Sequence, residues 1–287
     1  MNPEIQSILL GIVEGLTEFL PVSSTAHLRI TEALMQIPLD DAYWKMYTIV
    51  IQLGAILALL FLFLGRIGGF LRTFPRGENG DRNLLTHPIS LTLVAFAVTS
   101  VPALLLHKWS EKNLGSIKAI ALALLIGGIV MWIVDAWAAR RFDITSDVDE
   151  MTLPQAIWIG LCQSLSAIFP GTSRSMSTIA AGQLVGMSRP AALEFSFLLS
   201  IPTMIAATLW DLIKELHPGH GQAAHVVMNS QNWIVLIIGF VVSFIVAFGV
   251  VEWFLMWVRK HGFTLFAIYR ILLGSALLIY GTKYLGS

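Results

Sequence analysis

The sequence predicts an all-α integral membrane protein with about six transmembrane helices and two re-entrant helix pairs. Hydrophobic residues make up 56% of the 287 residues and charged residues only 13%, whereas a soluble domain carries about 25% charged residues. Apolar stretches of about 20 residues, enough to cross a bilayer, fall near 46–64, 88–107, 119–138, 190–212, 233–256 and 264–282. Two further apolar stretches are interrupted in the middle by a proline, which indicates helices that enter the membrane and turn back.

The first interrupted stretch, 4–37, contains polar residues where a hydrophobic helix is expected. Glu14 and Glu18 are four residues apart, so on a helix they share one face. Pro21 cannot continue that helix, because its ring clashes with the preceding turn and it lacks a backbone N–H. Ser24 is a good cap for a second helix. The stretch therefore predicts a helix, a break and a second helix, with the polar side chains gathered at the break.

The half-helix before this break, 4–19, is too short to span the membrane. At 1.5 Å per residue it would be about 24 Å long, against roughly 30 Å for the hydrocarbon core. Irregular backbone at that depth is tolerated only where it is buried in protein or lines a cavity. We therefore expect the break to lie inside the protein.

The second interrupted stretch, 153–188, resembles the first. Gly11, Glu14, Pro21 and Ser24 align at one constant offset with Gly160, Gln163, Pro170 and Ser173. Each re-entrant pair is followed by three spans, an odd number, so the second half must be inverted relative to the first. The chain thus reads as one membrane domain of two inverted repeats, about 1–140 and about 150–287, with a site at the midplane between them.

Charged loops predict the orientation of the spans. Four arginines against two acidic residues lie in the loop 65–87, and the short loop after residue 256 contains Arg259 and Lys260. Both loops are expected on the cytoplasmic side, because basic residues accumulate there. Counting spans from them places 20–45 and 213–232 outside. The first break then enters the membrane from outside and the second from inside.

The second break predicts an anion site. A helix that starts near Ser173 presents free backbone N–H groups and a positive dipole end. Arg174 adds a planar fork of donors suited to phosphate oxygens. A charge at membrane depth is costly and needs a partner. The alternative role for Arg174 is therefore an ion pair with Glu14 or Glu18 that only holds the repeats together.

The other polar residues near the first break each have a structural alternative. His27 follows Ser24 by three residues on the same helix face. The alternative for His27 is a satisfied core residue, and the alternative for Ser24 is a helix cap. Ser23 and Thr25 are expected to contact the substrate, yet they are equally good helix caps. Gln52 lies inside an apolar span and is expected to line the cavity.

Composition and the remaining reactive residues exclude several function classes. The formal net charge is zero, so nothing indicates a nucleic-acid partner. The single Cys162 cannot form an internal disulfide, and no cleavable signal peptide is expected at the N-terminus. His217, His220 and His225 fit no tight metal template and are expected in a solvated loop. Glu194 suits a helix start, with a supporting role near the site as the alternative.

Two long motifs and three shorter segments are similar to those of a known family. The first motif reads Glu-Gly-Leu-Thr-Glu-Phe-Leu-Pro-Val-Ser-Ser-Thr-Ala-His over 14–27, and the second reads Pro-Gly-Thr-Ser-Arg-Ser over 170–175. The shorter segments are 51–54, 194–199 and 266–270. In this order, and over essentially the whole chain, the sequence resembles the undecaprenyl-diphosphatases, also called bacitracin-resistance proteins.

The resemblance implies a membrane phosphatase that hydrolyses undecaprenyl diphosphate and so recycles the lipid carrier for cell-wall synthesis. It implies the bacterial plasma (inner) membrane, and the loop charges add a site that opens toward the outer side. The expected partners are the polyprenyl diphosphate lipid, the bilayer and a second copy of the chain as a homodimer. Carried over by position, the family's functional residues are Glu14, Glu18, Ser24, His27 and Arg174, with Ser173, Ser175 and Thr178 nearby.

The chemistry of the residues leaves two mechanisms open. A phosphatase needs a nucleophile, a proton acceptor and positive charge on the phosphoryl oxygens. We expect Ser24 to attack and His27 to act as its base; the rival is attack by water activated by Glu18 or His27. Two glutamates and a diphosphate would repel each other with one arginine between them. We therefore expect Mg²⁺ or Ca²⁺ bound by Glu14, Glu18 and the substrate, or a protonated carboxylate.

Two other function classes fit part of the pattern. A lipid or ion transporter, such as a flippase, suits inverted repeats with broken helices. A cation channel would place Glu14 and Glu18 in its filter. The polar set of Ser24 and His27 opposite Arg174 favours an enzyme over both.

Overall fold

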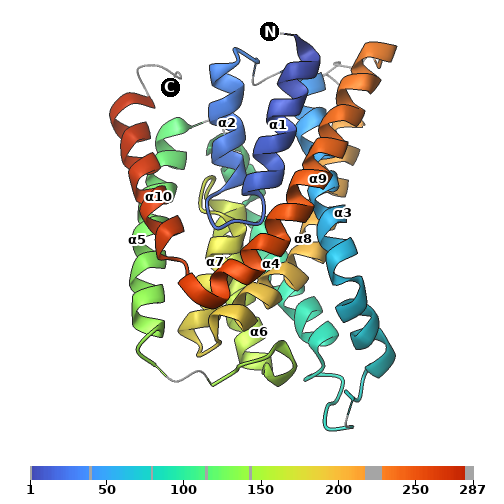
Figure 1. Ribbon diagram of the computed structural model, residues 1–287, viewed down its shortest axis with the longest axis vertical. Coiled ribbons are helices and arrows are strands. Elements are labelled where there is room, and N and C mark those ends of the chain that lie inside the picture. The colour runs from blue at the N-terminus through green and yellow to red at the C-terminus, as the bar shows by residue number, and fades with distance from the viewer. Residues whose placement is uncertain are drawn as a thin grey trace.

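The computed structural model describes residues 2–38, 41–78, 80–113, 116–141, 144–216 and 228–281, which form a helical bundle (Figure 1). The long helices are α3 (Ala42–Thr73), α4 (Pro88–Asn113), α5 (Ile117–Ala138), α8 (Arg189–Leu216) and α9 (Ser230–His261), and α10 (Thr264–Ala276) follows α9. A π-helical turn, Leu277–Gly281, continues α10. The short helices are α1 (Pro3–Thr17), α2 (Ser24–Leu34), α6 (Leu153–Ile168) and α7 (Arg174–Leu184), and a 3₁₀ turn, Val148–Glu150, precedes α6.

Six helices of the described chain are long and apolar enough to cross a membrane. They are α3, α4, α5, α8, α9, and α10 with its π-helical turn. Each one contains an apolar stretch that the sequence predicts as a span. The all-α membrane class is therefore confirmed.

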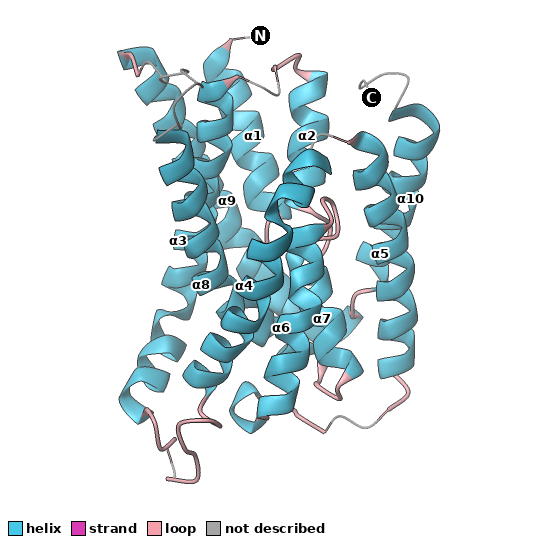
Figure 2. Ribbon diagram, turned by 180° about the vertical axis from the view of Figure 1, so that it is seen from behind, coloured by secondary structure: helices cyan, strands magenta, loops and turns pink. Residues whose placement is uncertain are grey.

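The two interrupted stretches fold as pairs of short helices that enter from opposite ends of the bundle. α1 enters from one end of the bundle and α2 returns to that end, whereas α6 enters from the opposite end and α7 returns to it (Figure 1 and Figure 2). The breaks meet inside the bundle, where the Ser175 hydroxyl donates to the Leu20 carbonyl at 3.0 Å. Both re-entrant pairs, with inverted topology, are confirmed.

Each break ends in a serine with a positive φ, 75° at Ser23 and 72° at Ser173. Each of these serines caps the next helix, because its hydroxyl oxygen accepts a backbone N–H from three residues further on. Ser23 therefore corresponds to Ser173, and Ser24 corresponds to Arg174. The expected alignment of Ser24 with Ser173 is wrong by one residue, because one residue more lies between Gly160 and the cap Ser173 than between Gly11 and the cap Ser23.

Glycine lets the re-entrant helices cross long helices at close range. α1 packs on α9, and α6 packs on α4, which are equivalent crossings in the two repeats. A Cβ atom on Gly11 would lie 2.8 Å from the Gly239 carbonyl oxygen, and one on Gly160 would lie 2.5 Å from the Ala95 carbonyl oxygen. Because no side chain fits at either crossing, these glycines fix how the short helices sit against their neighbours.

The end of the bundle opposite the start of α1 is braced by ion pairs. Arg66 of α3 contacts Asp147 (2.6 Å), Asp149 (2.8 Å) and Glu194 (2.7 Å), and so joins α3 to the 3₁₀ turn and to α8. Glu194 therefore braces the fold through Arg66, and its supporting role near the site stays a prediction.

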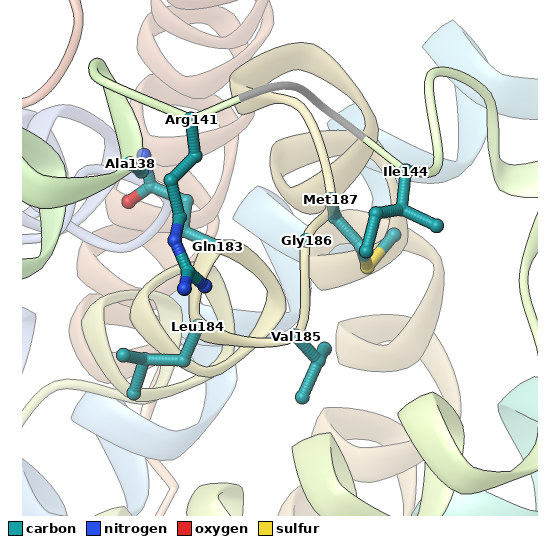
Figure 3. A pocket seen from close by; sticks show the side chains of 8 residues that line it. All are labelled: Ala138, Arg141, Ile144, Gln183, Leu184, Val185, Gly186 and Met187. Carbon is teal, nitrogen blue, oxygen red and sulfur yellow. The ribbon is translucent and has the colours of Figure 1, made fainter.

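The C-terminal end of α7 is held by the buried Asp135 of α5. Its carboxylate accepts hydrogen bonds from Gln183 (3.1 Å), Arg189 (2.7 Å) and the backbone N–H of Phe263 (3.1 Å). A pocket of about 220 Å³ lies beside this contact (Figure 3). Its lining residues are Ala138, Arg141, Ile144, Gln183, Leu184, Val185, Gly186 and Met187. None of the predicted site residues is among them.

Helix directions follow the predicted order of spans. The loops after α3 and α5 lie at the end opposite the start of α1 (Figure 2), and the turn after α9 packs near the end of α5, where the Phe263 N–H donates to Asp135. Only part of the loop 213–232 is described, and His217, His220 and His225 lie outside the described residues.

Candidate active site

Three predicted residues meet where the two breaks face each other. The Ser24 hydroxyl donates a short hydrogen bond to Glu18 Oε2. Arg174 Nη2 lies 3.4 Å from Glu18 Oε1, so the ion pair joins the first re-entrant pair to the second. Ser24 and Glu18 are buried, and the Arg174 side chain is only 12% exposed. The structure thus brings a hydroxyl, a carboxylate and a guanidinium together in one buried cluster.

Arg174 is placed by the start of α7. Ser173 caps the helix, so Arg174 is its first residue and stands at the positive end of the helix dipole. Apart from Glu18, the Arg174 guanidinium makes one long hydrogen bond among the described residues, 3.5 Å from Nη1 to the Ser196 carbonyl oxygen. The fork therefore keeps donor capacity that protein acceptors do not use, which suits an incoming phosphate.

Glu14 lies one turn before Glu18 on α1 and is fully buried. Neither of its carboxylate oxygens accepts a hydrogen bond from an N–H or hydroxyl donor among the described residues; the Glu18 carboxyl is close enough to share a proton with it, and Arg174 attracts its charge. A buried charge without a donor is strongly unfavourable. Glu14 therefore requires either a proton or a cation.

His27 does not contact Ser24 as expected. Its Nδ1 lies 2.7 Å from the Ser23 carbonyl oxygen, and its Nε2 lies 2.6 Å from the Tyr269 hydroxyl. The recorded partner of the Ser24 hydroxyl is Glu18. The predicted Ser24–His27 pair is thus replaced by a Ser24–Glu18 pair, because the start of α2 turns Ser24 back toward α1.

The hydroxyls of the second break stabilise its backbone. Ser175 donates to Leu20 across the breaks and lies 3.1 Å from the cap Ser173. Thr178 donates to the Arg174 carbonyl at 3.0 Å and lies 2.6 Å from the Ser196 hydroxyl. These residues lie in the cluster, as expected, and hold Arg174 in place.

For Ser23, Thr25 and Gln52 the contacts give no direct sign of a chemical role. Ser23 is buried and acts as the cap of α2, which is the structural alternative. Thr25 and Gln52 are half-buried, and neither makes a side-chain hydrogen bond within the described part of the chain. Their expected contact with substrate stays a prediction.

Arg270 is the main residue that sequence reasoning missed at this site. It is fully buried and donates to carbonyl oxygens of both breaks: Pro21 at 3.2 Å, Gly171 at 3.3 Å and Thr172 at 2.9 Å. It also donates to Ala123 of α5 at 3.1 Å. The available signal was a lone arginine inside an apolar span, which marks a functional position by default.

Arg270 also changes the charge balance near the breaks. The region of the breaks thus holds two buried glutamates and two arginines, and Arg270 bonds there to backbone carbonyl oxygens rather than to the glutamates. No group of three or more His, Cys, Asp or Glu side chains suited to a metal occurs in the part of the chain that the structure describes. Glu14 and Glu18 alone would leave a divalent cation short of ligands, so phosphate oxygens of a substrate would have to complete its shell.

Comparison with known proteins finds a matching family model and relatives that align over nearly the whole chain. A family model described as bacitracin resistance protein BacA matches residues 7–276. An undecaprenyl-diphosphatase of Koribacter versatilis (strain Ellin345) is 59% identical over 99% of this chain and 100% of that protein. Undecaprenyl-diphosphatases of Caldanaerobacter subterraneus subsp. tengcongensis and Aquifex aeolicus (strain VF5) are each 40% identical, over 96% and 98% of this chain and 94% and 99% of those proteins.

Proposed function

This chain belongs to the bacitracin resistance protein BacA family, and we propose that it hydrolyses undecaprenyl diphosphate to undecaprenyl phosphate and inorganic phosphate. The product is the lipid carrier that is recycled for cell-wall synthesis. One observation carries the proposal: the Ser24 hydroxyl bonds to Glu18 beside Arg174. A nucleophile, a proton acceptor and a phosphate-binding cation are what hydrolysis of a diphosphate requires.

The contacts favour Ser24 as the nucleophile and Glu18 as its base. Ser24 Oγ forms a bond to the terminal phosphorus, and its proton passes to Glu18. The bond from that phosphorus to the bridging oxygen breaks, and the electron pair stays on the lipid-linked phosphate. Water then hydrolyses the phosphoserine and releases inorganic phosphate. Arg174 and the N-terminus of α7 stabilise the negative charge on the terminal phosphoryl oxygens.

A divalent cation, Mg²⁺ or Ca²⁺, is part of the proposal. The two unpartnered oxygens of Glu14 fit a hard cation, which would be held by Glu14 and Glu18 together with the diphosphate. When bound, the ion would neutralise charge between carboxylates and substrate. If so, a chelator should abolish phosphate release and either ion should restore it. Full activity in excess chelator would remove the ion from the account.

Location and partners follow from family and composition. The six spans make the chain a multi-pass protein of the bacterial plasma membrane, where its lipid substrate resides. We place the opening of the site on the outer side, because the basic loops 65–87 and 259–260 favour the cytoplasmic side. A homodimer stays a prediction.

Phosphate release by the purified protein in detergent tests the function. Detergent leaves no second compartment, so a transporter or a channel would release nothing. The proposal expects inorganic phosphate and undecaprenyl phosphate in equal amounts. It also expects release to be nearly abolished in Glu18→Gln, because the amide is isosteric with the carboxylate but cannot take the Ser24 proton. Wild-type protein that binds the lipid without releasing phosphate would favour the transporter.

A further inference from the structure

Two ring systems are joined at the edge of the site, the imidazole of His27 and the phenol of Tyr269. The rings stack with centroids 5.6 Å apart and planes 14° apart, and His27 Nε2 lies 2.6 Å from the Tyr269 hydroxyl. The Ser23 carbonyl, 2.7 Å from Nδ1, can only accept, so Nδ1 carries a proton. The Tyr269 hydroxyl therefore fixes Nε2 in either charge state of the ring.

Tyr269 stands between the breaks and the bilayer. Its side chain is 42% exposed, and Leu265 and Leu272, one turn away on the same face of α10, are 56% and 65% exposed. In a membrane protein such apolar side chains face lipid. The next residue, Arg270, is fully buried and bonds to both breaks. Two adjacent residues of α10 thus lie on different sides, Tyr269 at the lipid-facing surface and Arg270 at the centre of the site.

The pair also lies one helical turn from the nucleophile. His27 follows Ser24 by three residues on the same face of α2, a rise of about 4.5 Å. The proposed function, on which this inference rests, places the terminal phosphate at Ser24 and Arg174. The prenyl chain must stay in the bilayer. The lipid-linked phosphate therefore lies between Ser24 and the lipid, where His27 and Tyr269 are.

We propose that Tyr269, oriented by His27, binds the lipid-linked phosphate of the substrate. When the imidazole is charged, Nε2–H donates to the phenol oxygen, and the phenol O–H becomes free to donate to a phosphate oxygen. Hydrogen bonds to a charged oxygen are roughly twice as strong as neutral ones. The bond strengthens as the lipid-linked phosphate gains the electron pair of the broken P–O bond, so it favours release of that phosphate.

Product inhibition separates the two phosphate positions. Undecaprenyl phosphate contains only the lipid-linked phosphate, whereas inorganic phosphate mimics the terminal one. In Tyr269→Phe, the inhibition constant of undecaprenyl phosphate should rise about tenfold, as expected for a lost charge-assisted bond. The inhibition constant of inorganic phosphate should stay within about twofold. Arg174→Lys should show the reverse pattern.

A matched control variant and a double-mutant cycle complete the test. Tyr280→Phe removes a phenol from the same end of the chain at a position 59% exposed, and neither inhibition constant should change. In a His27→Asn background, Tyr269→Phe should add less than about a twofold effect, because the phenol has lost its partner. Unchanged inhibition by undecaprenyl phosphate in Tyr269→Phe, or equal weakening for both products, would overturn the proposal.

Direct binding keeps this test separate from the proposed function. Affinity of the detergent-solubilised protein for undecaprenyl phosphate requires no turnover. If the wild-type protein released no phosphate, the proposed function would fail. The comparison of wild type, Tyr269→Phe and Tyr280→Phe by binding would still decide the role of Tyr269. Thermal unfolding of the three proteins shows whether each variant is folded.

Discussion

Ser24 and Arg174 hold the same place in the two repeats. Each is the first residue of a second half-helix and follows a serine cap with a positive φ. In the proposed mechanism the first repeat uses this place for a nucleophile, and the second uses it for a phosphate-binding cation. The two repeats also differ in their first half-helices, where Glu14 of the first is a carboxylic acid and its counterpart Gln163 in the second is a neutral amide. Two copies of one backbone arrangement thus carry complementary chemistry, and neither copy is a complete site.

Arg174→Lys tests the phosphate-binding role at this scale. Lysine keeps the charge but loses the planar fork that can bind two oxygens. We expect kcat/KM to fall at least about tenfold, which corresponds to about 1.4 kcal/mol, in a protein that folds normally. Activity within about twofold of wild type, measured as phosphate release in detergent, would rule out the fork as the clamp.

At the scale of elements, the short helices can form the site because they are too short to cross the membrane. α2 and α7 have 11 residues each, or about 16 Å at 1.5 Å per residue. Both helices therefore begin inside the bundle, and their positive dipole ends are directed at the same buried region. Long helices supply the surroundings: α9 and α4 hold the re-entrant pairs, and α10 contributes Arg270.

Gly160→Ala tests how tightly these elements cross. The added Cβ would lie 2.5 Å from the Ala95 carbonyl oxygen, so α6 must shift, at a cost of about 1–3 kcal/mol. We expect a lower unfolding temperature in detergent and a loss of activity. Gly68→Ala in α3 is the control, because nothing lies within 4 Å of its Cβ and alanine is the better helix former. Equal unfolding temperatures for the two variants would contradict the tight crossing.

Sequence reasoning recovers the elements better than the contacts. Hydropathy and the prolines Pro21 and Pro170 predict all six spans and both breaks, because length and backbone chemistry are local properties. The repeat alignment fails by one residue, because the second repeat has one residue more between its aligned glycine and its cap serine, and a constant offset cannot show that. The partners of Ser24, His27 and Arg270 come from residues far away or from the turn of a break, which periodicity does not encode.

For the whole molecule, the central prediction is an inverted arrangement with a defined orientation. The start of α1 and the π-helical turn after α10 share one end of the bundle, and the loops after α3 and α5 share the other (Figure 1). The basic residues of 65–87 favour the cytoplasm for the second end.

Cysteine labelling in intact cells, in a Cys162→Ser background, measures this orientation. Glu78→Cys should be protected from an impermeant reagent, and Pro38→Cys, between α2 and α3, should be labelled. Both positions are exposed, so accessibility within the protein does not decide the result. Labelling at residue 78 and protection at residue 38 would invert the orientation and place the opening on the inner side.

A phosphoenzyme on Ser24 tests most directly that the two repeats form one hydrolytic site. Rapid quench with diphosphate lipid labelled at the terminal phosphorus should trap phosphoserine on the wild-type protein, and peptide mapping should place it at Ser24. Ser24→Ala should form none and should be nearly inactive even at high pH, because no base replaces the missing oxygen. If Ser24→Ala kept more than roughly a tenth of wild-type kcat, the lost hydroxyl would be worth only a hydrogen bond of about 1 kcal/mol. That result, with no trapped phosphoenzyme on the wild type, would contradict the account and make water the nucleophile.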